Sequence, residues 1–251
     1  MEKTDYIFGI RTVIEAIEAG KTIDKVFIRK DLGSDLAAEL FDTMRAHGIV
    51  AQRVPQQRLD RITRKNHQGV IALLAAVDYA TIDQLIPTLY EEGVLPFVIV
   101  LDGITDVRNF GAIARTADCA GADAIVIPEH GSVSVQADAV KTSAGALHYL
   151  PVCRERNIYS AVRNLKDRGF NVVAVTEKTD KNYTEADFTG PTALVLGAED
   201  TGISPEVLRL CDSRAAIPMF GNISSLNVSV AAGVVMYEVV RQRLAADMSV
   251  R

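Results

Sequence analysis

Short apolar runs alternate with stretches of helical periodicity through most of the chain, and this alternation limits the possible folds more than any other feature. In the second two-thirds, the apolar runs lie at 97–101, 124–127, 150–153, 172–176 and 193–196, with helical patterns between them. An unbroken run of this length suits a strand that is buried on both faces, as in a parallel sheet covered by helices. We therefore predict an α/β fold with a mostly parallel sheet.

The first part of the chain shows the same alternation on a smaller scale. Helical patterns at 9–18 and 35–47 and a short helix through Leu59 separate extended patterns at 25–29, 49–54 and 70–75. We predict a small α/β domain over residues 1–77, a linker over 78–96 and a larger domain over 97–251. The larger domain ends in an extended segment at 215–218 and a long C-terminal helix.

The composition is that of a folded protein without a membrane segment. Hydrophobic residues make up 48% of the 251 positions, and no stretch of about 20 apolar residues occurs. The cysteines form no CxxC pair, which favours a reducing compartment and a place in the core for Cys119, Cys153 and Cys211. The histidines show no metal-binding spacing. We therefore expect a cytoplasmic protein with no bound metal and no membrane contact.

The charge is uneven along the chain. The net charge of −5 arises in residues 79–251, which carry 15 basic and 21 acidic side chains, whereas residues 1–78 carry 12 and 11. The segment 53–67 contains one aspartate and five basic residues, which we call the basic patch: Arg53, Arg58, Arg61, Arg64 and Lys65. Such a patch can follow the phosphate backbone of a nucleic acid, or it can be the solvated face of a short helix.

Glycine-bearing loops follow three of the predicted strands, after Leu101, Leu196 and Pro218. Ligands of parallel sheets bind at the carboxyl ends of the strands, so chemistry is expected there. The segment 197–202 (GAEDTG) has the glycine spacing of a phosphate-binding loop, but it continues Ile-Ser instead of Lys-Ser or Lys-Thr. No GxGxxG follows any strand, so a nucleotide-binding oxidoreductase is disfavoured.

Taken singly, the polar residues near these loops have structural explanations. Ser225 and Asn227 can cap the helix that follows them, and Asn109 can be a turn residue before Gly111. Arg115 can be an ordinary arginine on a helix surface, since only one face of its helix needs to be buried. Each residue alone therefore leaves the function open.

Taken together, three segments resemble a known family in their order and spacing: NFGAIARTADCAGA (109–122), LVLGAEDTG (194–202) and IPMFGNISSLNVSVAAG (217–233). They resemble the three motifs of the SpoU/TrmH family of RNA 2′-O-ribose methyltransferases, in the SPOUT superfamily. The resemblance spans residues 97 to about 243. The N-terminal domain, with His67-Gln-Gly-Val70 near its end, resembles the RNA-binding extension of the RlmB type.

This resemblance implies a SPOUT-type fold, in which a trefoil knot in the C-terminal domain forms the pocket for S-adenosylmethionine. It implies a homodimer whose two chains both contribute to each active site. The implied reaction methylates the 2′-hydroxyl of a guanosine ribose in 23S ribosomal RNA or a large-subunit precursor. The alternatives are the same chemistry on transfer RNA and a non-catalytic, rRNA-binding assembly factor with this fold.

Carried over position by position, the resemblance assigns roles to individual residues. Those expected to line the cofactor pocket are Gly197, Glu199, Ile217, Met219, Ser225 and Leu226. Those that match the polar catalytic set are Asn109, Arg115, Glu199, Ser225 and Asn227. Those expected to bind RNA are the basic patch, His67, Arg108 and Arg115.

The chemistry of methyl transfer suits these residue types. The reaction is a displacement that aligns the ribose oxygen, the methyl carbon and the sulfur, with help in removing a proton from a weakly acidic alcohol. A guanidinium normally keeps its proton. We therefore expect Arg115 to bind the adjacent phosphate or the developing alkoxide, oriented by Asn109 and Glu199.

Two positions depart from the family pattern. Asp200 follows the glutamate of the second motif, where the family commonly has glycine, and it adds a carboxylate beside the cofactor loop. The chain reads Asp106-Val107-Arg108-Asn109 where the family commonly reads Asp-Pro-x-Asn. We expect cofactor binding to be kept despite Asp200.

Overall fold

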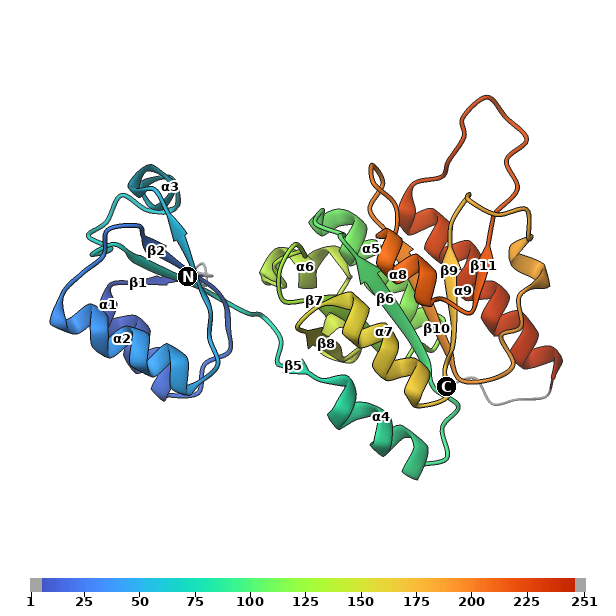
Figure 1. Ribbon diagram of the computed structural model, residues 1–251, viewed down its shortest axis with the longest axis horizontal. Helices are drawn as coiled ribbons and strands as arrows, with labels where there is room; N and C mark the ends of the chain where they lie inside the picture. The colour runs from blue at the N-terminus through green and yellow to red at the C-terminus, as the bar shows by residue number, and fades with distance from the viewer. Residues whose placement is uncertain (1–5, 247–251) are drawn as a thin grey trace. The chain divides into compact units, whose positions relative to one another are not determined.

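The computed structural model describes residues 6–246 and divides the chain into two compact units. The first unit ends at Asp78 and the second begins at Tyr79, with the short segment Ser134–Ala137 grouped with the first unit. Figure 1 shows the helices and strands of each unit in order along the chain. Both units are α/β, as predicted.

The first unit is a four-stranded sheet with helices on both faces. Its strands are β1 (Tyr6–Phe8), β2 (Ile23–Arg29), β3 (Ala51–Val54) and β4 (Val70–Leu74), in the order β1-β4-β2-β3, and its helices are α1 (Ile10–Glu18), α2 (Asp35–Ala46) and α3 (Gln56–Ile62). Helices α1 and α2 pack on one face through Val13 and Leu40, and α3 packs on the other through Leu59. Successive strand residues point to opposite faces, so Val26 and Phe27 of β2 join different clusters.

The second unit is built on a seven-stranded sheet in which all neighbouring strands are parallel. The strands are β5 (Tyr79–Ala80), β6 (Phe97–Asp102), β7 (Ala124–Pro128), β8 (Val152–Glu155), β9 (Asn171–Val175), β10 (Thr192–Gly197) and β11 (Ser213–Ala215), in the order β11-β9-β10-β6-β7-β8-β5. The central strands β10, β6 and β7 are buried almost throughout, as their unbroken apolar runs predict. The α/β fold with a parallel sheet is therefore confirmed, and the trefoil knot stays a prediction.

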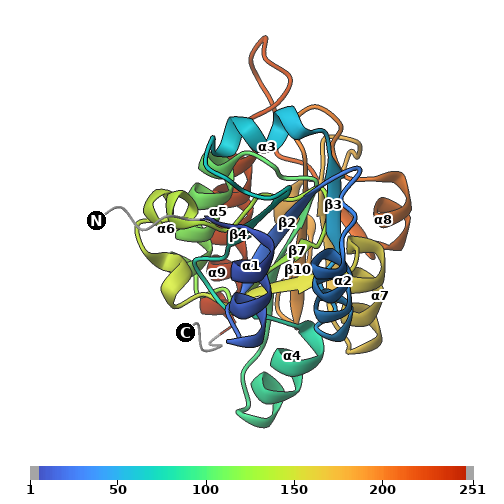
Figure 2. The same ribbon diagram turned by 90° about the vertical axis from the view of Figure 1, so that its left-hand side faces the viewer.

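Helices cover both faces of this sheet. They are α4 (Ile82–Glu91), α5 (Val107–Cys119), α6 (Ala137–Thr142), α7 (Ile158–Asp167), α8 (Pro205–Leu210) and α9 (Val228–Ala245), with the short 3₁₀ helices η1 (Ala146–His148) and η2 (Tyr183–Glu185). Helices α4, α7 and α8 share one apolar cluster on one face, and α5 and α9 contact each other on the opposite side (Figure 2). Within residues 6–246, none of the helices is long and apolar enough to span a membrane.

The segment 78–96 is not the linker that we expected, because it belongs to the second unit. It adds β5 to the edge of the sheet beside β8, and it forms α4. Ile82, Ile86 and Leu89 repeat at helical spacing and are buried in the apolar cluster. The carboxylate of Glu155 accepts a hydrogen bond from the backbone N–H of Ile82 (2.7 Å) and so holds the start of this helix.

The cysteines differ in burial, although we predicted all three in the core. Cys153 is buried, and this burial raises the pKa of its thiol to about 12, so that it stays protonated at neutral pH. Cys211 is half-buried and Cys119 is exposed. The prediction is wrong for Cys119 because it is the last residue of α5, whose buried side chains, such as Ile113 and Ala117, lie on another face.

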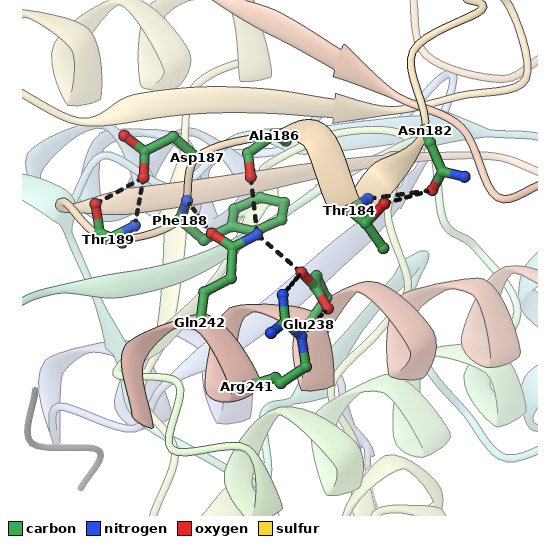
Figure 3. Close-up of polar contacts among 9 residues, drawn as sticks. All are labelled: Asn182, Thr184, Ala186, Asp187, Phe188, Thr189, Glu238, Arg241 and Gln242. Carbon is green, nitrogen blue, oxygen red and sulfur yellow. Dashed lines mark hydrogen bonds and ion pairs between the residues drawn. The ribbon is translucent and has the colours of Figure 1, made fainter. Parts of the chain in front are cut away.

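The C-terminal half of α9 is anchored to the connection between β9 and β10. The side chain of Gln242 accepts a hydrogen bond from the N–H of Phe188 (3.0 Å) and donates to the carbonyl of Ala186 (2.9 Å), as Figure 3 shows. Buried Glu238 pairs with Arg241 (2.7 Å) and accepts a hydrogen bond from Gln242 (2.8 Å). These contacts fix the direction of α9 relative to the sheet.

Arg243 fastens the end of the same helix. Its side chain is buried, donates to the carbonyls of Leu95 (3.0 Å), Pro96 (3.1 Å) and Gly190 (3.1 Å), and lies 5.4 Å from the ring centroid of Phe97. A buried guanidinium is costly unless its donors are satisfied, and here these three carbonyls, the carbonyl of Phe188 (3.4 Å) and an aromatic face surround it. An apolar stripe of the same helix packs into the core through its buried residues: Val228, Ala232, Val235, Met236 and Val239.

Candidate active site

A cavity of about 390 Å³ lies at the carboxyl ends of β9, β10 and β11. Residues of four segments line it: 175–177 after β9, 196–203 around the end of β10, 215–219 after β11, and 224–231 at the start of α9. The three strands are neighbours in the sheet, so the loops that follow them meet at one place. The volume falls in the range of about 300–1,000 Å³ that is typical of small-molecule pockets.

The lining of this cavity includes every residue that we expected around a cofactor: Gly197, Glu199, Ile217, Met219, Ser225 and Leu226. Val175, Thr176 and Glu177 also line it and were not predicted. These three residues stand where an apolar run ends at the carboxyl end of β9. They share with the other loops a position at the carboxyl end of a parallel strand, where ligands of such sheets bind.

Gly197 is required by the close approach of two backbone segments. A Cβ atom at this position would lie 2.2 Å from the backbone carbon of Gly202 and 2.2 Å from the nitrogen of Ile203. The turn between them is closed by a hydrogen bond from the N–H of Gly202 to the carbonyl of Ala198 (2.8 Å). The exposed Asp200 lies in this turn, which keeps its closing hydrogen bond without the family's glycine.

Three polar side chains from three elements meet beside the cavity. Asn109 of α5 donates a hydrogen bond from Nδ2 to Oε1 of Glu199 (3.2 Å), which follows β10. Nδ2 of Asn227 donates to Oδ1 of Asn109 (3.0 Å) and to Oε1 of Glu199 (2.5 Å). The backbone N–H of Val228 also lies 3.4 Å from the same Glu199 oxygen. We call these three side chains, of Asn109, Glu199 and Asn227, the polar cluster.

Asn227 has a structural role as well as a place in the polar cluster. Its Oδ1 atom accepts a hydrogen bond from the N–H of Ser229 (3.0 Å) and so caps α9. The cap uses the carbonyl end of the amide and leaves the amino end for Asn109 and Glu199. The capping interpretation and the site interpretation are therefore compatible.

Asn109 lies within helix α5 and not in a turn before it. The helix begins at Val107, so Asn109 is its third residue. Its N-cap is Asp106, whose carboxylate accepts hydrogen bonds from the N–H groups of Arg108 (2.9 Å) and Asn109 (2.8 Å). Val107 occupies the first helical position, where proline is favoured because its fixed φ suits a helix start. The aspartate cap thus holds the helix start in the absence of the family's proline.

Arg115 does not join the polar cluster. It lies six residues after Asn109 on α5, which is about 9 Å along the helix axis and on another side of it. Its side chain is exposed, and within residues 6–246 it forms no hydrogen bond or ion pair. Ser225 lines the cavity next to the cluster, and Arg108 is exposed in the first turn of α5.

All five residues of the basic patch are exposed on or near α3 in the first unit. Three of them lie over aromatic rings: Arg53 over Phe41 (5.6 Å), Arg58 over Phe27 (5.0 Å) and Lys65 over Phe8 (5.8 Å). Such contacts hold the stems of the side chains in place while the charges remain exposed. Three of the five cations are therefore held in place by contacts within the unit.

His67 differs from its basic neighbours because it is buried. Its Nε2 atom lies 3.0 Å from Oδ1 of Asp60, and its Nδ1 accepts a hydrogen bond from the N–H of Gly69 (3.0 Å). Both ring nitrogens are thus engaged inside the unit. The prediction of a direct RNA contact by this side chain is wrong, and its role in the fold is to hold the turn before β4.

Two family models match the chain. Residues 96–237 match the SpoU rRNA methylase family, and residues 6–80 match the substrate-binding domain of RNA 2′-O-ribose methyltransferases. The first match alone covers more than half of the chain. The chain belongs to the SpoU rRNA methylase family. As a member of this family it is an RNA 2′-O-ribose methyltransferase.

Two relatives of this SpoU-family chain match nearly its whole length, and a third matches a smaller part of it. A Bacillus subtilis (strain 168) protein named as a TrmH family tRNA/rRNA methyltransferase is 36% identical over 242 residues, which cover 96% of this chain and 97% of that protein. The crystal structure of the SpoU methyltransferase AviRb from Streptomyces viridochromogenes, in complex with AdoMet, is similar with a TM-score of 0.61 and 28% identity, over 96% of this chain and 90% of that one. The A. aeolicus TrmH/SpoU tRNA modifying enzyme is 31% identical with a TM-score of 0.54, over 61% of this chain and 78% of that enzyme.

Proposed function

We propose that the protein is a cytoplasmic enzyme that transfers a methyl group from S-adenosylmethionine to the 2′-hydroxyl of a guanosine ribose in 23S ribosomal RNA. The observation that carries this proposal is the position of the polar cluster. Two of its members, Glu199 and Asn227, also line the cavity, so the cavity and the cluster form a single site. The residues that would perform the chemistry thereby border the residues that would hold the cofactor.

The cavity suits S-adenosylmethionine, which has apolar, hydrogen-bonding and charged parts. Leu196, Ile217 and Leu226 supply apolar lining, and Thr176 and Ser225 supply hydroxyl groups. Gly197 also lines the cavity, and its lack of a side chain lets the backbone of Gly202 and Ile203 pack against it and shape this wall. When bound, the cofactor supplies the methyl group on its sulfonium.

The polar cluster is suited to orienting a ribose hydroxyl. The carboxylate of Glu199 is an acceptor, and the two asparagines supply both donors and acceptors, each held by the other members. Fixed groups of this kind reduce the reorganisation needed when the hydroxyl attacks. We assign Asn109, Glu199 and Asn227 to positioning the hydroxyl, with Ser225 beside the cofactor and Arg115 on the phosphate or the developing alkoxide.

We infer that a second copy of the chain completes the site, because Arg115 is exposed away from the polar cluster. Helix α9 contacts α5, the helix that carries Arg115. The exposed face of α9 carries large apolar side chains at seven-residue intervals: Val230, Tyr237 and Leu244, which are 52%, 51% and 63% exposed. Residues at this spacing share one helix face, and such a face needs a cover. A homodimer that covers it brings Arg115 of the partner subunit toward the cluster.

Features of the first unit support ribosomal RNA as the substrate. Its basic patch supplies the positive charge that an acidic chain needs to bind a phosphate backbone. This unit matches the family of substrate-binding domains of RNA 2′-O-ribose methyltransferases. The similarity to the A. aeolicus tRNA modifying enzyme, in contrast, covers only 61% of the chain. These observations favour a large, structured RNA such as ribosomal RNA over transfer RNA.

The test is nucleoside mass spectrometry after incubation of the purified protein with methyl-labelled S-adenosylmethionine and either unmodified 23S rRNA or transfer RNA. An Asn109→Ala, Glu199→Ala variant serves as the control. We expect labelled 2′-O-methylguanosine in the ribosomal RNA only, and only with the intact protein. Label in transfer RNA alone would replace the substrate in this proposal, and cofactor binding without label in either RNA would favour an RNA-binding assembly factor.

A further inference from the structure

Phe220 is the most exposed large hydrophobic side chain among residues 6–246. It is 97% exposed, compared with 82% for Tyr149 and 75% for Ile223. Phenylalanine is normally among the more buried residues, so a ring left almost wholly in water calls for a partner that covers it. No side chain of the described part of the chain covers this one.

The position of Phe220 indicates what that partner is. The ring belongs to the loop 216–227, which joins β11 to α9 and stands out from the second unit in Figure 1. Its neighbour Met219 lines the cavity, and so do Ser224 and Ser225 a few residues later. The same loop then reaches Asn227 of the polar cluster. Phe220 therefore lies on the loop that connects the cofactor cavity to the groups that would orient the ribose.

A ribose that reaches the polar cluster brings its base with it. Proteins that recognise RNA commonly take an unpaired base out of its stack and place it on an aromatic side chain, because every base offers a flat π-face. An exposed phenylalanine on the loop that leads to the polar cluster has the shape and chemistry for that contact. Ile223, on the same loop, has no ring and cannot stack.

We propose that Phe220 is the stacking platform for the base of the methylated nucleotide. This inference rests on the proposed function and adds a substrate-binding residue to it. The ring positions the nucleotide so that its 2′-hydroxyl meets the polar cluster, and it acts on RNA binding without contacting the cofactor. Because stacking tolerates any base, the platform selects an unpaired nucleotide and leaves the choice of guanosine to other groups.

The binding test uses the absence of tryptophan from the chain. Phe220→Trp places a single fluorescent indole at the proposed platform, and Ile223→Trp places one on the same loop as a matched control. We expect saturating unmodified 23S rRNA to quench the indole at position 220 and to leave the one at 223 nearly unchanged. An unquenched Phe220→Trp protein, under conditions in which filter binding shows the RNA to be bound, would overturn the proposal.

The kinetic test separates the platform from the cofactor site. Removal of one base stack costs between about 5-fold and about 150-fold in affinity, so Phe220→Ala should raise KM for RNA by a factor in this range. The Kd for S-adenosylmethionine should not change, and Phe220→Tyr should restore KM. An unchanged KM in Phe220→Ala, or an equal rise in Ile223→Ala, would contradict the proposal.

These measurements also distinguish the inference from its alternatives. If a second copy of the chain covers the ring, the indole of Phe220→Trp will respond to protein dilution and not to RNA, and the proposal fails. If the wild-type protein transfers no methyl group but RNA quenches the indole at position 220, the proposed function fails while the stacking contact stands.

Discussion

Nδ2 of Asn227 lies 3.0 Å from Oδ1 of Asn109, although 118 positions separate the two residues in the sequence. One asparagine begins α9 and the other lies in the first turn of α5, so the contact fixes the starts of two helices against each other. The carboxylate of Glu199 accepts a hydrogen bond from both amides. The geometry of the site therefore depends on three segments packing together: α5, the start of α9 and the turn after β10.

Asn227→Ser should separate the capping role of Asn227 from its role in the polar cluster. Serine caps a helix about as well as asparagine but has no amide to donate to Asn109 and Glu199. We expect near wild-type stability in urea and a methyl-transfer rate about 100-fold lower, because small displacements of positioned groups cost about that much. Asn227→Ala should lose about 1 kcal/mol of stability in addition. Full activity in Asn227→Ser would remove this residue from the proposed chemistry.

Gly197→Ala should abolish cofactor binding. The added methyl group would clash with the backbone of Gly202 and Ile203, and a rigid backbone cannot move aside as a side chain can. We expect a loss of about 1–3 kcal/mol in stability and no measurable heat of S-adenosylmethionine binding by calorimetry. Gly190→Ala is the matched control, since a Cβ there meets nothing within 4 Å. Normal binding by Gly197→Ala would show that this part of the cavity is not used.

Reversing two charges of the basic patch, in Arg61→Glu with Arg64→Glu, should weaken RNA binding and flatten its salt dependence. Each phosphate that the protein no longer neutralises reduces the steepness of log K against log salt by about 0.7–0.9. The matched control is Arg11→Glu with Arg45→Glu, which makes the same charge change on α1 and α2, on the other face of the sheet. Filter binding at several salt concentrations measures the slope. An unchanged slope in the patch variant would identify the patch as ordinary surface.

Two inactive variants should restore activity when they share a dimer. If Arg115 acts on the polar cluster of the partner subunit, co-expression of Arg115→Ala and Glu199→Ala chains yields mixed dimers that each retain one intact site. We expect each variant alone to be inactive and a random mixture to recover about a quarter of the wild-type activity. No recovery from purified mixed dimers would place both residues in the same chain's site.

Acid should weaken the anchor of α9 through Glu238. Hydrogen bonds from Arg241 hold the pKa of this carboxyl below its ordinary value of about 4.3, against the opposing effect of burial. A carboxyl with a lowered folded-state pKa stabilises the protein above the unfolded pKa, and this contribution is lost as the pH falls through the folded value. In urea denaturation, the free energy of unfolding should therefore fall less steeply with decreasing pH in Glu238→Gln than in the wild type, below about pH 4.3. Parallel pH profiles for the two proteins would contradict this assignment.

Periodicity predicts the central sheet well because its strands have no polar side. The apolar runs of β6, β7 and β10 are buried almost throughout, as strands covered on both faces require. The short edge strands are different. β1 and β5 have three and two residues, too few to show a period, and they are strands only because β4 and β8 pair with them. Tertiary contacts decide such elements.

The site was predictable in part. Glycine loops at strand ends indicated where the cavity lies, and the resemblance named its lining residues. The meeting of Asn109 with Asn227 could not be derived from spacing, since it depends on how two distant helices pack. For His67 the sequence was misleading. Its place in a basic segment favoured RNA binding, but only the fold shows that its side chain is buried against Asp60.

The anchoring of α9 has a consequence for the order in which a nascent chain matures. Phe188 is translated 54 residues before Gln242, whose side chain accepts a hydrogen bond from the backbone N–H of Phe188. Until the ribosome has passed Arg243, the carbonyls of Leu95 and Gly190 lack the guanidinium that joins them. Asn227, which completes the polar cluster, is also translated late. Folding during synthesis can therefore build most of the sheet first, but methyl-transfer competence comes only with the last helix.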